Sequence, residues 1–495
     1  MDPITSILRN SAVLIGAKVV SAAMGLALIA VLPRLLGDVE YGRLHLALSL
    51  VGMFGVAVDF GLTQVMARSV ARDRTLARAF LRRAGAITLG LGVAAYAGLF
   101  GLLAIVAYPV GTGAVVAVLG LGMILDALAQ LLSGLFQGHE RMVVPAAARI
   151  VGNALTLGLL APWFWSEGPA DATAVAAVLV ASSVVRLLIQ AWGLRGLDGL
   201  RAGRAGPAAD LPWRGLLAAG LPFLLWQALG VIYFRMDVIM LGRLAPAATV
   251  GWYGAASRLL DGLTFIADVV TITSYPVMAR LWIESPGEFG RIAQRTLDLL
   301  LVVTVPLSVS LLVFAPQIVE TLFSAQFAGT VPILRVQAFT LALLFLDYFL
   351  ATVLMAIGRE RAWLRIAVVA CVLNPVLNWV AIPLTEARYG NGGIGAAAAT
   401  LTTEACVAVC ALALTPRGAL GAAWAGRLLR LGAGAVAMAG VVAVSLGLGA
   451  PWFLGGVVGG LAYLGVVVRL GLLPADVLSR LRAMGTWRPA REVVS

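Results

Sequence analysis

The segment Ser11–Pro33, SAVLIGAKVVSAAMGLALIAVLP, is apolar throughout except for Lys18. A helix rises about 1.5 Å per residue, so a run of this length crosses the roughly 30 Å hydrocarbon core of a bilayer. Comparable apolar runs recur along the whole chain. Backbone groups in lipid must find their hydrogen bonds within the segment, which such runs do as helices. The segment therefore predicts a membrane-spanning helix, and the chain an all-α polytopic membrane protein.

The composition of the whole chain agrees with this class. Hydrophobic residues make up 61% of the 495 residues and charged residues only 12%, whereas about 25% of the residues of a soluble domain are charged. The formal net charge is +12, and Lys18 is the only lysine. A basic balance of this size is compatible with nucleic-acid binding, so its distribution along the chain decides its meaning.

Apolar windows of membrane-spanning length predict about fourteen transmembrane helices. The expected spans are 8–32, 42–66, 84–108, 113–136, 144–165, 173–193, 214–235, 250–278, 297–320, 332–356, 364–384, 393–414, 427–447 and 452–472.

Arginines are concentrated in every second loop between these spans. The loop after the second span, RSVARDRTLARAFLRR, runs from Arg68 to Arg83 and contains six of them, whereas the intervening loops are short or acidic. Because basic loops stay on the cytoplasmic side of a membrane, we expect both termini in the cytoplasm. The positive charge is then mainly a topology signal, with some attraction to anionic lipid headgroups. We expect no nucleic-acid partner.

Two short sequence echoes indicate an internal duplication. GHER from Gly138 follows the fourth span and GRER from Gly358 follows the tenth, while EYG from Glu40 and WYG from Trp252 open the second and eighth spans. An even number of spans gives both repeats the same orientation, so we expect two six-helix bundles related by a pseudo-twofold axis along the membrane normal, with the substrate path between them. The predicted parts are bundles at 1–200 and 201–420, two extra helices at 421–475 and a cytoplasmic tail at 476–495.

Several longer segments resemble one family in their order and spacing. They are ILRNSAVLIGAKVV from Ile7, RLLGDVEYGRLHLALSLVGMFGVAVDFGL from Arg34, RMDVIMLG from Arg235 with VGWYGAASRL from Val250, ILRVQAFTLALLFLDYFLATVLMAIGRER from Ile333, and LNPVLNWVAIPLTEARYGNGGIGAAAATLTTE from Leu373. These segments resemble bacterial polysaccharide-export flippases, whose superfamily also contains multidrug-extrusion antiporters and lipid II flippases. The resemblance covers roughly residues 7–415.

The resemblance implies a carrier rather than an enzyme. Its expected substrate is undecaprenyl-diphosphate-linked oligosaccharide, moved by alternating access from the inner to the outer leaflet of the cell inner membrane for surface polysaccharide such as the O-antigen of lipopolysaccharide. The expected partners are this lipid-linked oligosaccharide, the bilayer, a polysaccharide polymerase, and H⁺ or Na⁺ as a coupling ion. The N-terminal segment does not look like that of the lipid II flippases, although that substrate stays an alternative.

Lys18 is the leading candidate for substrate binding. Counted from the start of its helix it lies near mid-membrane, too deep for its ammonium to reach the interface comfortably. A cation at this depth on a cavity-lining helix suits a diphosphate. The alternative is an ion pair with Asp59, which lies at comparable depth on the second span. Both interpretations hold together if the substrate displaces the carboxylate.

The other ionisable residues of the spans are candidates by the same argument, because each costs at least a few kcal/mol in the membrane. The candidates for binding diphosphate or sugar are Lys18, Arg258, Arg235 and Arg149, with Arg186 beside Arg149 at a cytoplasmic entrance. The candidates for ion coupling are Asp59, Asp261, Asp268 and Glu404, together with Asp126 and Asp347. The alternatives are anchoring at the membrane interface for the arginines and pairing within the bundle for the acids.

Pro222 in AAGLPFLLWQALG is expected to break the seventh helix, because proline lacks the donor of a helical hydrogen bond. Such a break serves either as a hinge for alternating access or as a static kink.

No catalytic set, nucleotide-binding loop or metal-ligand cluster stands at usable spacing, so we expect no enzymatic activity, cofactor or metal. The three cysteines, Cys371, Cys406 and Cys410, are expected to be small buried packing residues. A cation-coupled multidrug antiporter is the main alternative function, and it would favour a cavity of acids and aromatics. A membrane glycosyltransferase would need a larger extracytoplasmic loop than the sequence provides.

Overall fold

The computed structural model describes residues 3–472 apart from 107, 166–169, 198–211 and 417–423. The side chains of residues 3–19 and of a few other helical residues also lie outside the described part. The predicted boundary between the bundles, at residues 200 and 201, and the whole predicted tail, 476–495, therefore lie outside the described residues.

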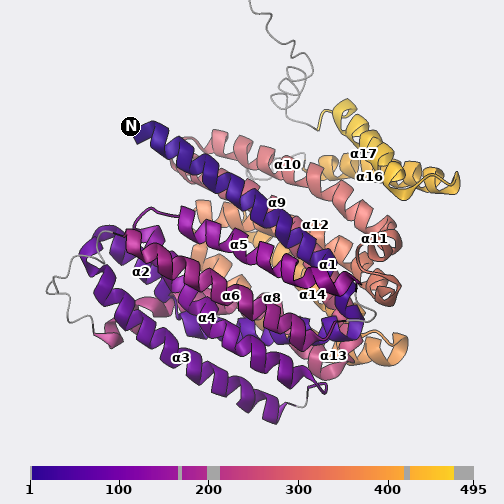
Figure 1. Ribbon diagram of the computed structural model, residues 1–495. Coiled ribbons are helices and arrows are strands. Elements are labelled where there is room, and N and C mark those ends of the chain that lie inside the picture. The colour runs from indigo at the N-terminus through magenta and orange to yellow at the C-terminus, as the bar shows by residue number, and fades with distance from the viewer. Residues whose placement is uncertain (1–2, 107, 166–169, 198–211, 417–423, 473–495) are drawn as a thin grey trace, which may run out of the picture. The chain divides into compact units, whose positions relative to one another are not determined.

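The described chain consists of helices joined by short connections (Figure 1). The α-helices are α1 (Pro3–Asp59), α2 (Leu62–Arg72), α3 (Ala77–Ile105), α4 (Thr112–Gly138), α5 (Val143–Leu160), α6 (Ala172–Gly193), α8 (Trp213–Leu244), α9 (Ala247–Glu284), α10 (Pro286–Val313), α11 (Ala315–Leu322), α12 (Thr330–Ala356), α13 (Glu360–Tyr389), α14 (Gly392–Leu414), α16 (Trp424–Gly447) and α17 (Trp452–Arg469).

The predicted class is confirmed. In the described part, 13 helical stretches are long and apolar enough to cross a membrane, and one of them, Ala23–Arg72, contains the end of the first predicted span and the whole second span. The kink inside α1 lies at Gly37, between these two spans. Each later predicted span also overlaps a helix of the structure, although the span 297–320 is divided between α10 and α11.

The second and seventh predicted spans differ from the structure in where the helix is interrupted. The second predicted span ends at Asp59 and resumes as α2 at Leu62, because Phe60 and Gly61 both adopt positive φ. The break expected at Pro222 is wrong, since α8 runs without interruption from Trp213 to Leu244. Close packing accompanies this continuity: Gly220, two residues before the proline, lies directly against the carbonyl oxygen of Phe60, which holds α8 against the turn at this point.

The helices form two compact units that interleave along the sequence. The first comprises Met1–Arg258, Val319–Thr330 and Cys371–Ala399, and the second comprises Leu259–Ile318, Val331–Ala370 and Thr400–Ser495. Their boundaries pass through α9, α13 and α14 and do not follow the predicted ranges 1–200 and 201–420. The two-bundle division stays a prediction from the sequence.

In the first unit, α4 lies at the centre, packed against α1, α2, α3 and α6. One hydrophobic cluster joins the ends of four helices and includes Met66, Phe80 and Phe136, each at most 1% exposed. Other side chains of α4 do not belong to this cluster, and several of them are polar. They can therefore line a cavity.

The two segments that echo each other in sequence meet within the first unit. Gly42 of α1 lies in direct backbone contact with Ala247 and Gly251 of α9, and Gly254 packs on the ring of His45. A side chain at Gly42 or Gly251 would overlap the opposite backbone. The glycines of both echoes are therefore needed where these two helices cross.

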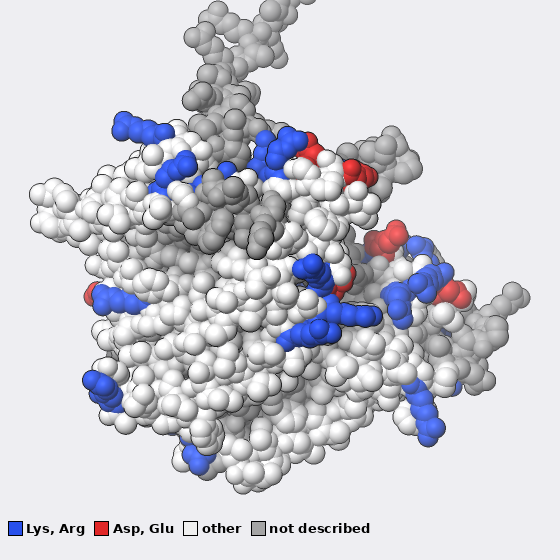
Figure 2. Space-filling model, turned by 180° about the vertical axis from the view of Figure 1, so that it is seen from behind, with Lys and Arg blue, Asp and Glu red and all other residues white. Residues whose placement is uncertain are grey.

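In the second unit, α16 and α17 form a hairpin that packs on α10. Its core includes Val442, Tyr463 and Val467, all fully buried. Outward-facing positions of many helices are large and apolar, for example Val93, Leu188 and Leu461. Figure 2 shows broad areas of uncharged surface between groups of arginines, as expected for surfaces that contact lipid.

Candidate functional site

The candidate site lies in the first unit and begins at the turn between α1 and α2. Gly61 has φ 71°, which a residue without a side chain adopts at little cost. The carboxylate of Asp59 accepts hydrogen bonds from the Gly61 N–H at 3.1 Å, from the Thr63 hydroxyl, and from Gln227 Nε2 on α8 at 3.3 Å. It satisfies donors at the start of α2 and fixes the turn beside a cavity.

The cavity beside Asp59, called the larger cavity below, has a volume of about 330 Å³. This is at the lower end of the range of about 300–1,000 Å³ that is typical of ligand sites. Its lining residues come from α1, α2, α4 and α8. They are Val51, Gly52, Gly55, Val56, Asp59, Thr63, Gln64, Met123, Asp126, Ala127, Gln130 and Gln227. The wall thus combines amides, a hydroxyl and two carboxylates with an apolar patch, and none of these lining residues is basic.

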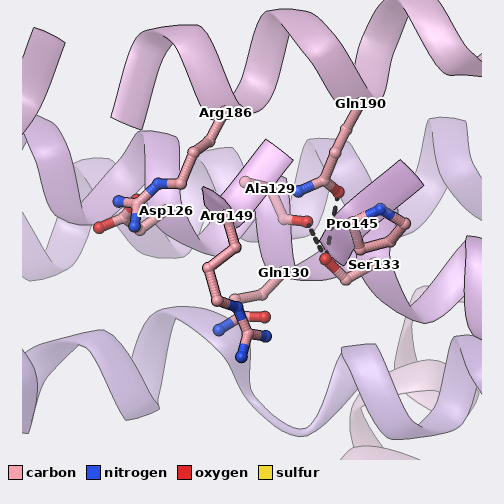
Figure 3. Close-up of a pocket in the computed structure, with 8 residues that line it drawn as sticks. All are labelled: Asp126, Ala129, Gln130, Ser133, Pro145, Arg149, Arg186 and Gln190. Atoms are coloured by element: carbon pink, nitrogen blue, oxygen red, sulfur yellow. Dashed lines mark hydrogen bonds and ion pairs between the residues drawn. The ribbon is translucent and has the colours of Figure 1, made fainter. Parts of the chain in front are cut away.

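A smaller cavity of about 150 Å³ adjoins the first, because Asp126 and Gln130 line both. Its other lining residues come from α4, α5 and α6 and are Ala129, Ser133, Pro145, Arg149, Arg186 and Gln190 (Figure 3). Arg186 donates to Asp126 Oδ1 and to the Ser183 hydroxyl, both at 2.7 Å. Three helices therefore bring two guanidinium groups to one small polar space.

Arg149 differs from Arg186 in having no partner. Among the described residues it makes no hydrogen bond or ion pair, and its side chain is exposed. Figure 3 shows it extending from α5 away from the Arg186–Asp126 pair. An unpaired guanidinium with its fork of donors available is the group that binds phosphate oxygens best. The smaller cavity is therefore suited to an anion.

Ser133 and Gln190 order the far wall of the smaller cavity. The Ser133 hydroxyl donates to the Ala129 carbonyl at 3.0 Å and to Gln190 Oε1 at 3.1 Å (Figure 3). Gln190 is buried, so these bonds fix the orientation of its amide. The residues around Arg149 are thus held in place before a ligand binds.

Two other predicted cations lie elsewhere in the first unit. Arg235 on α8 and Arg258 on α9 both lie near the buried His45, and neither lines the two cavities. Near them Asp237 is 5% exposed and accepts hydrogen bonds from the Tyr253 hydroxyl at 2.6 Å and from Asn378 Nδ2 at 2.6 Å. The structure therefore does not bring Arg235 and Arg258 together with Arg149.

The second unit holds a different polar cluster. Asp347 on α12 is 5% exposed, Glu404 on α14 is 2% exposed, and their carboxyl groups are neighbours. Neither oxygen of Asp347 has a donor among the described residues. Two carboxylates so placed cannot both be charged without a shared cation, because repulsion and desolvation add. Tyr348 follows Asp347, and the exposed Asp261 and Asp268 of α9 lie around it.

The family model for polysaccharide biosynthesis proteins matches residues 7–282, more than half of the chain. The chain belongs to this family. A second model, MatE, matches residues 222–380. No sequence among the curated proteins matches the chain.

Several solved structures of membrane transporters share the fold of this chain at low sequence identity. Lipid II flippase MurJ in an inward closed conformation is 14% identical, with a TM-score of 0.68 over 92% of this chain and 98% of that chain. An inward-facing multidrug resistance MATE family transporter of the MOP superfamily is 16% identical, with a TM-score of 0.61 over 79% of this chain and 98% of that chain. A MOP superfamily transporter from Pyrococcus furiosus is 15% identical, with a TM-score of 0.51 over 85% and 95%.

The family match and the helices of membrane-spanning length make this chain a multi-pass membrane protein of the polysaccharide biosynthesis family, with a fold similar to that of MurJ and of a MATE family transporter. The matched families are those of carriers rather than enzymes. The family-level resemblance seen in the sequence is therefore confirmed, while the substrate is a separate question.

The structure gathers only some of the residues expected from the sequence. It places Asp59 and Arg149 at adjoining cavities with Asp126 and Arg186, but the side chain of Lys18 lies outside the described residues, so its role stays a prediction. The expectation of buried cysteines is wrong for the exposed Cys406 and Cys410. These two lie on an outer face of α14, where a small apolar side chain is also tolerated.

Sequence reasoning missed the amides that line the cavities. Gln64, Gln130, Gln190 and Gln227 all lie in apolar helices. An uncharged amide in a predicted span carries the same desolvation argument as a charge, in weaker form. That signal was present in the sequence and was not used.

Proposed function

We propose that this protein is a flippase that moves undecaprenyl-diphosphate-linked oligosaccharide from the inner to the outer leaflet of the cell inner membrane, for synthesis of surface polysaccharide of the O-antigen type. The observation that carries the proposal is the unpaired Arg149 on the wall of a polar cavity inside an apolar helical unit. Membership of the polysaccharide biosynthesis family supports the substrate class.

The cavity answers the physical problem of moving this lipid. A diphosphate and its sugars cannot cross hydrocarbon unaided, because each unpaired polar group costs several kcal/mol there. Arg149 supplies a fixed cation for phosphate, and neighbouring amides supply donors and acceptors for hydroxyl groups. The prenyl chain stays in lipid. Lys18 is proposed as a further cation on the substrate path.

Transport then proceeds by alternating access of the two predicted halves. The coupling ion is proposed to be H⁺ or Na⁺, bound at Asp347 and Glu404, where two buried carboxyl groups lie side by side. Both termini are proposed to be cytoplasmic on the evidence of the arginine-rich loops. A polysaccharide polymerase outside the cytoplasm is the class of enzyme that would consume the product.

The test measures surface polysaccharide in cells whose only copy carries Arg149→Gln, with Arg149→Lys and Arg68→Gln beside it. Arg68 is an exposed arginine on α2 that lines neither cavity. Hydrogen bonds to charged groups are worth about 1.5–3 kcal/mol, so we expect Arg149→Gln to lower export at least about tenfold. Arg149→Lys should retain part of the activity and Arg68→Gln nearly all of it. Normal export by Arg149→Gln at equal protein level would overturn the proposal.

A cation-coupled multidrug antiporter is the second candidate, favoured by the buried pair Asp347 and Glu404. The same cells distinguish it. An antiporter would confer resistance to cationic drugs that is lost with Asp347→Asn and unaffected by Arg149→Gln, whereas the flippase confers no such resistance.

A further inference from the structure

The two adjoining cavities differ in chemistry although they share a wall. The smaller is lined by Arg149 and Arg186, and the larger by Gln64, Gln227 and Asp59 without any basic side chain among its described lining residues. Asp126 and Gln130 belong to both. A ligand that fills both must therefore carry an anionic part next to a neutral, hydroxyl-rich part.

The polar groups of the larger cavity are suited to hydroxyl groups. Gln64 and Gln130 are exposed to the cavity, and neither makes a hydrogen bond to a described residue. Each amide offers two donors and an acceptor, which matches hydroxyl groups that both donate and accept. Asp59 is already held by Gly61, Thr63 and Gln227, so its carboxylate is fixed in place as an acceptor.

The larger cavity also has an apolar lining. Val51, Val56 and Met123 contribute aliphatic side chains, and Gly52 and Gly55 contribute helix surface without a side chain. A Cβ added at Gly52 would meet nothing within 4 Å. A lining that combines amides with aliphatic surface suits a sugar ring, which carries hydroxyl groups around apolar C–H faces.

We propose that the larger cavity is a sugar subsite, which binds the sugar residue attached directly to the diphosphate while Arg149 and Arg186 bind the phosphates in the smaller cavity. This inference rests on the proposed function. It adds a site for the first sugar, the part of the substrate that would set specificity. In the substrate, the diphosphate is bonded directly to the first sugar. The two cavities are neighbours in the same way, because Asp126 and Gln130 line both.

Gly52→Leu is the variant that separates the two cavities. Gly52 lines the larger cavity, and a Cβ added there meets nothing within 4 Å. Leucine is also a better helix former than glycine, so we expect the fold to be retained with the new side chain in the cavity. Gly90→Leu is the matched control, since Gly90 on α3 is exposed, has nothing within 4 Å of an added Cβ, and lines neither cavity. Gln227→Leu removes one amide at similar volume.

The experiment measures equilibrium binding to the purified full-length protein in lipid nanodiscs. The probes are farnesyl diphosphate and the same diphosphate carrying glucose, galactose or N-acetylglucosamine. For the wild type and Gly90→Leu we expect at least one sugar to tighten binding about tenfold, the gain expected from about two hydrogen bonds. Gly52→Leu should lose this gain and Gln227→Leu most of it, while both bind farnesyl diphosphate as the wild type does.

The outcomes separate the two proposals. If the wild type binds no probe, or if Arg149→Gln binds farnesyl diphosphate as tightly as the wild type, the proposed function fails. If farnesyl diphosphate binds at Arg149 but no sugar tightens binding, or if Gly52→Leu keeps the sugar gain, the sugar subsite alone is overturned.

Discussion

The polar sites of the two units are opposite in charge and in how their charges are satisfied. In the first unit Asp126 and Asp59 have donors within 3.3 Å, and the unpaired group is a cation, Arg149. In the second unit the unpaired group is an acid, Asp347, with another acid as its neighbour. The exposed guanidinium of Arg149 has its donors available to an anion, whereas the buried acid pair of the second unit needs a shared proton or cation. The first is suited to an anionic substrate and the second to a cation.

The largest expected effect comes from removing one acid of the second unit. In Asp347→Asn the new amide donates to Glu404, so the fold is kept, but one charge of the cation site is lost. We expect the rate of translocation in proteoliposomes to lose its acceleration by an imposed H⁺ or Na⁺ gradient, a decrease of at least about tenfold. The downhill exchange without a gradient should persist.

Glu360→Gln is the control, because Glu360 is an exposed acid in the first turn of α13, belongs to the same unit and is not among the predicted coupling residues. It should change the gradient-dependent rate little. If the H⁺ and Na⁺ gradients accelerate translocation equally in Asp347→Asn and in the wild type, the acid pair is structural. Only the first unit would then have a ligand site.

An intermediate effect is expected where Asp126 and Arg186 pair at the wall shared by both cavities. In Asp126→Asn, Arg186 no longer shares its guanidinium between a carboxylate and phosphate, so binding of farnesyl diphosphate should tighten about threefold. In Arg186→Gln it should weaken by a similar factor. The effects are small because the side chain of Asp126 is 49% exposed and exposed pairs contribute only about 0.2–1 kcal/mol.

Isothermal calorimetry on the purified variants measures both affinities. Changes of the same sign in the two variants would mean that the pair serves only to hold α4 against α6, and would contradict a role in anion binding.

The smallest effect concerns a carboxylate outside the membrane, which serves as a reference for the other acids. Hydrogen bonds from the Thr75 hydroxyl and N–H lower the pKa of the exposed Asp73. A carboxyl group whose folded-state pKa is lowered stabilises the fold above its unfolded pKa, near 3.9, and this contribution is lost as the pH falls through the folded value. Asp73→Asn should therefore lower Tm slightly at pH 7 and not at all near pH 2. A difference in Tm that persists at low pH would point to another cause.

The sequence was sufficient for the membrane class, the helices and the family, because these depend on long apolar runs and on segments such as that from Arg34. It was insufficient at Pro222, since the packing of Gly220 on Phe60 is a tertiary contact that no local pattern reveals. Among the predicted site residues, Asp59 and Arg149 lie on the walls of two adjoining cavities, and their roles stay predictions. Depth alone does not say which charges are paired, so the difference between Arg149 and Arg186 required the structure.

The most direct test of the central claim is an electron cryomicroscopy structure of the full-length protein in nanodiscs with farnesyl diphosphate bound. The account predicts density for the diphosphate within hydrogen-bonding distance of the Arg149 guanidinium, in the smaller cavity of the first unit. Diphosphate density elsewhere, with Arg149 unchanged and its cavity filled only by water, would contradict it.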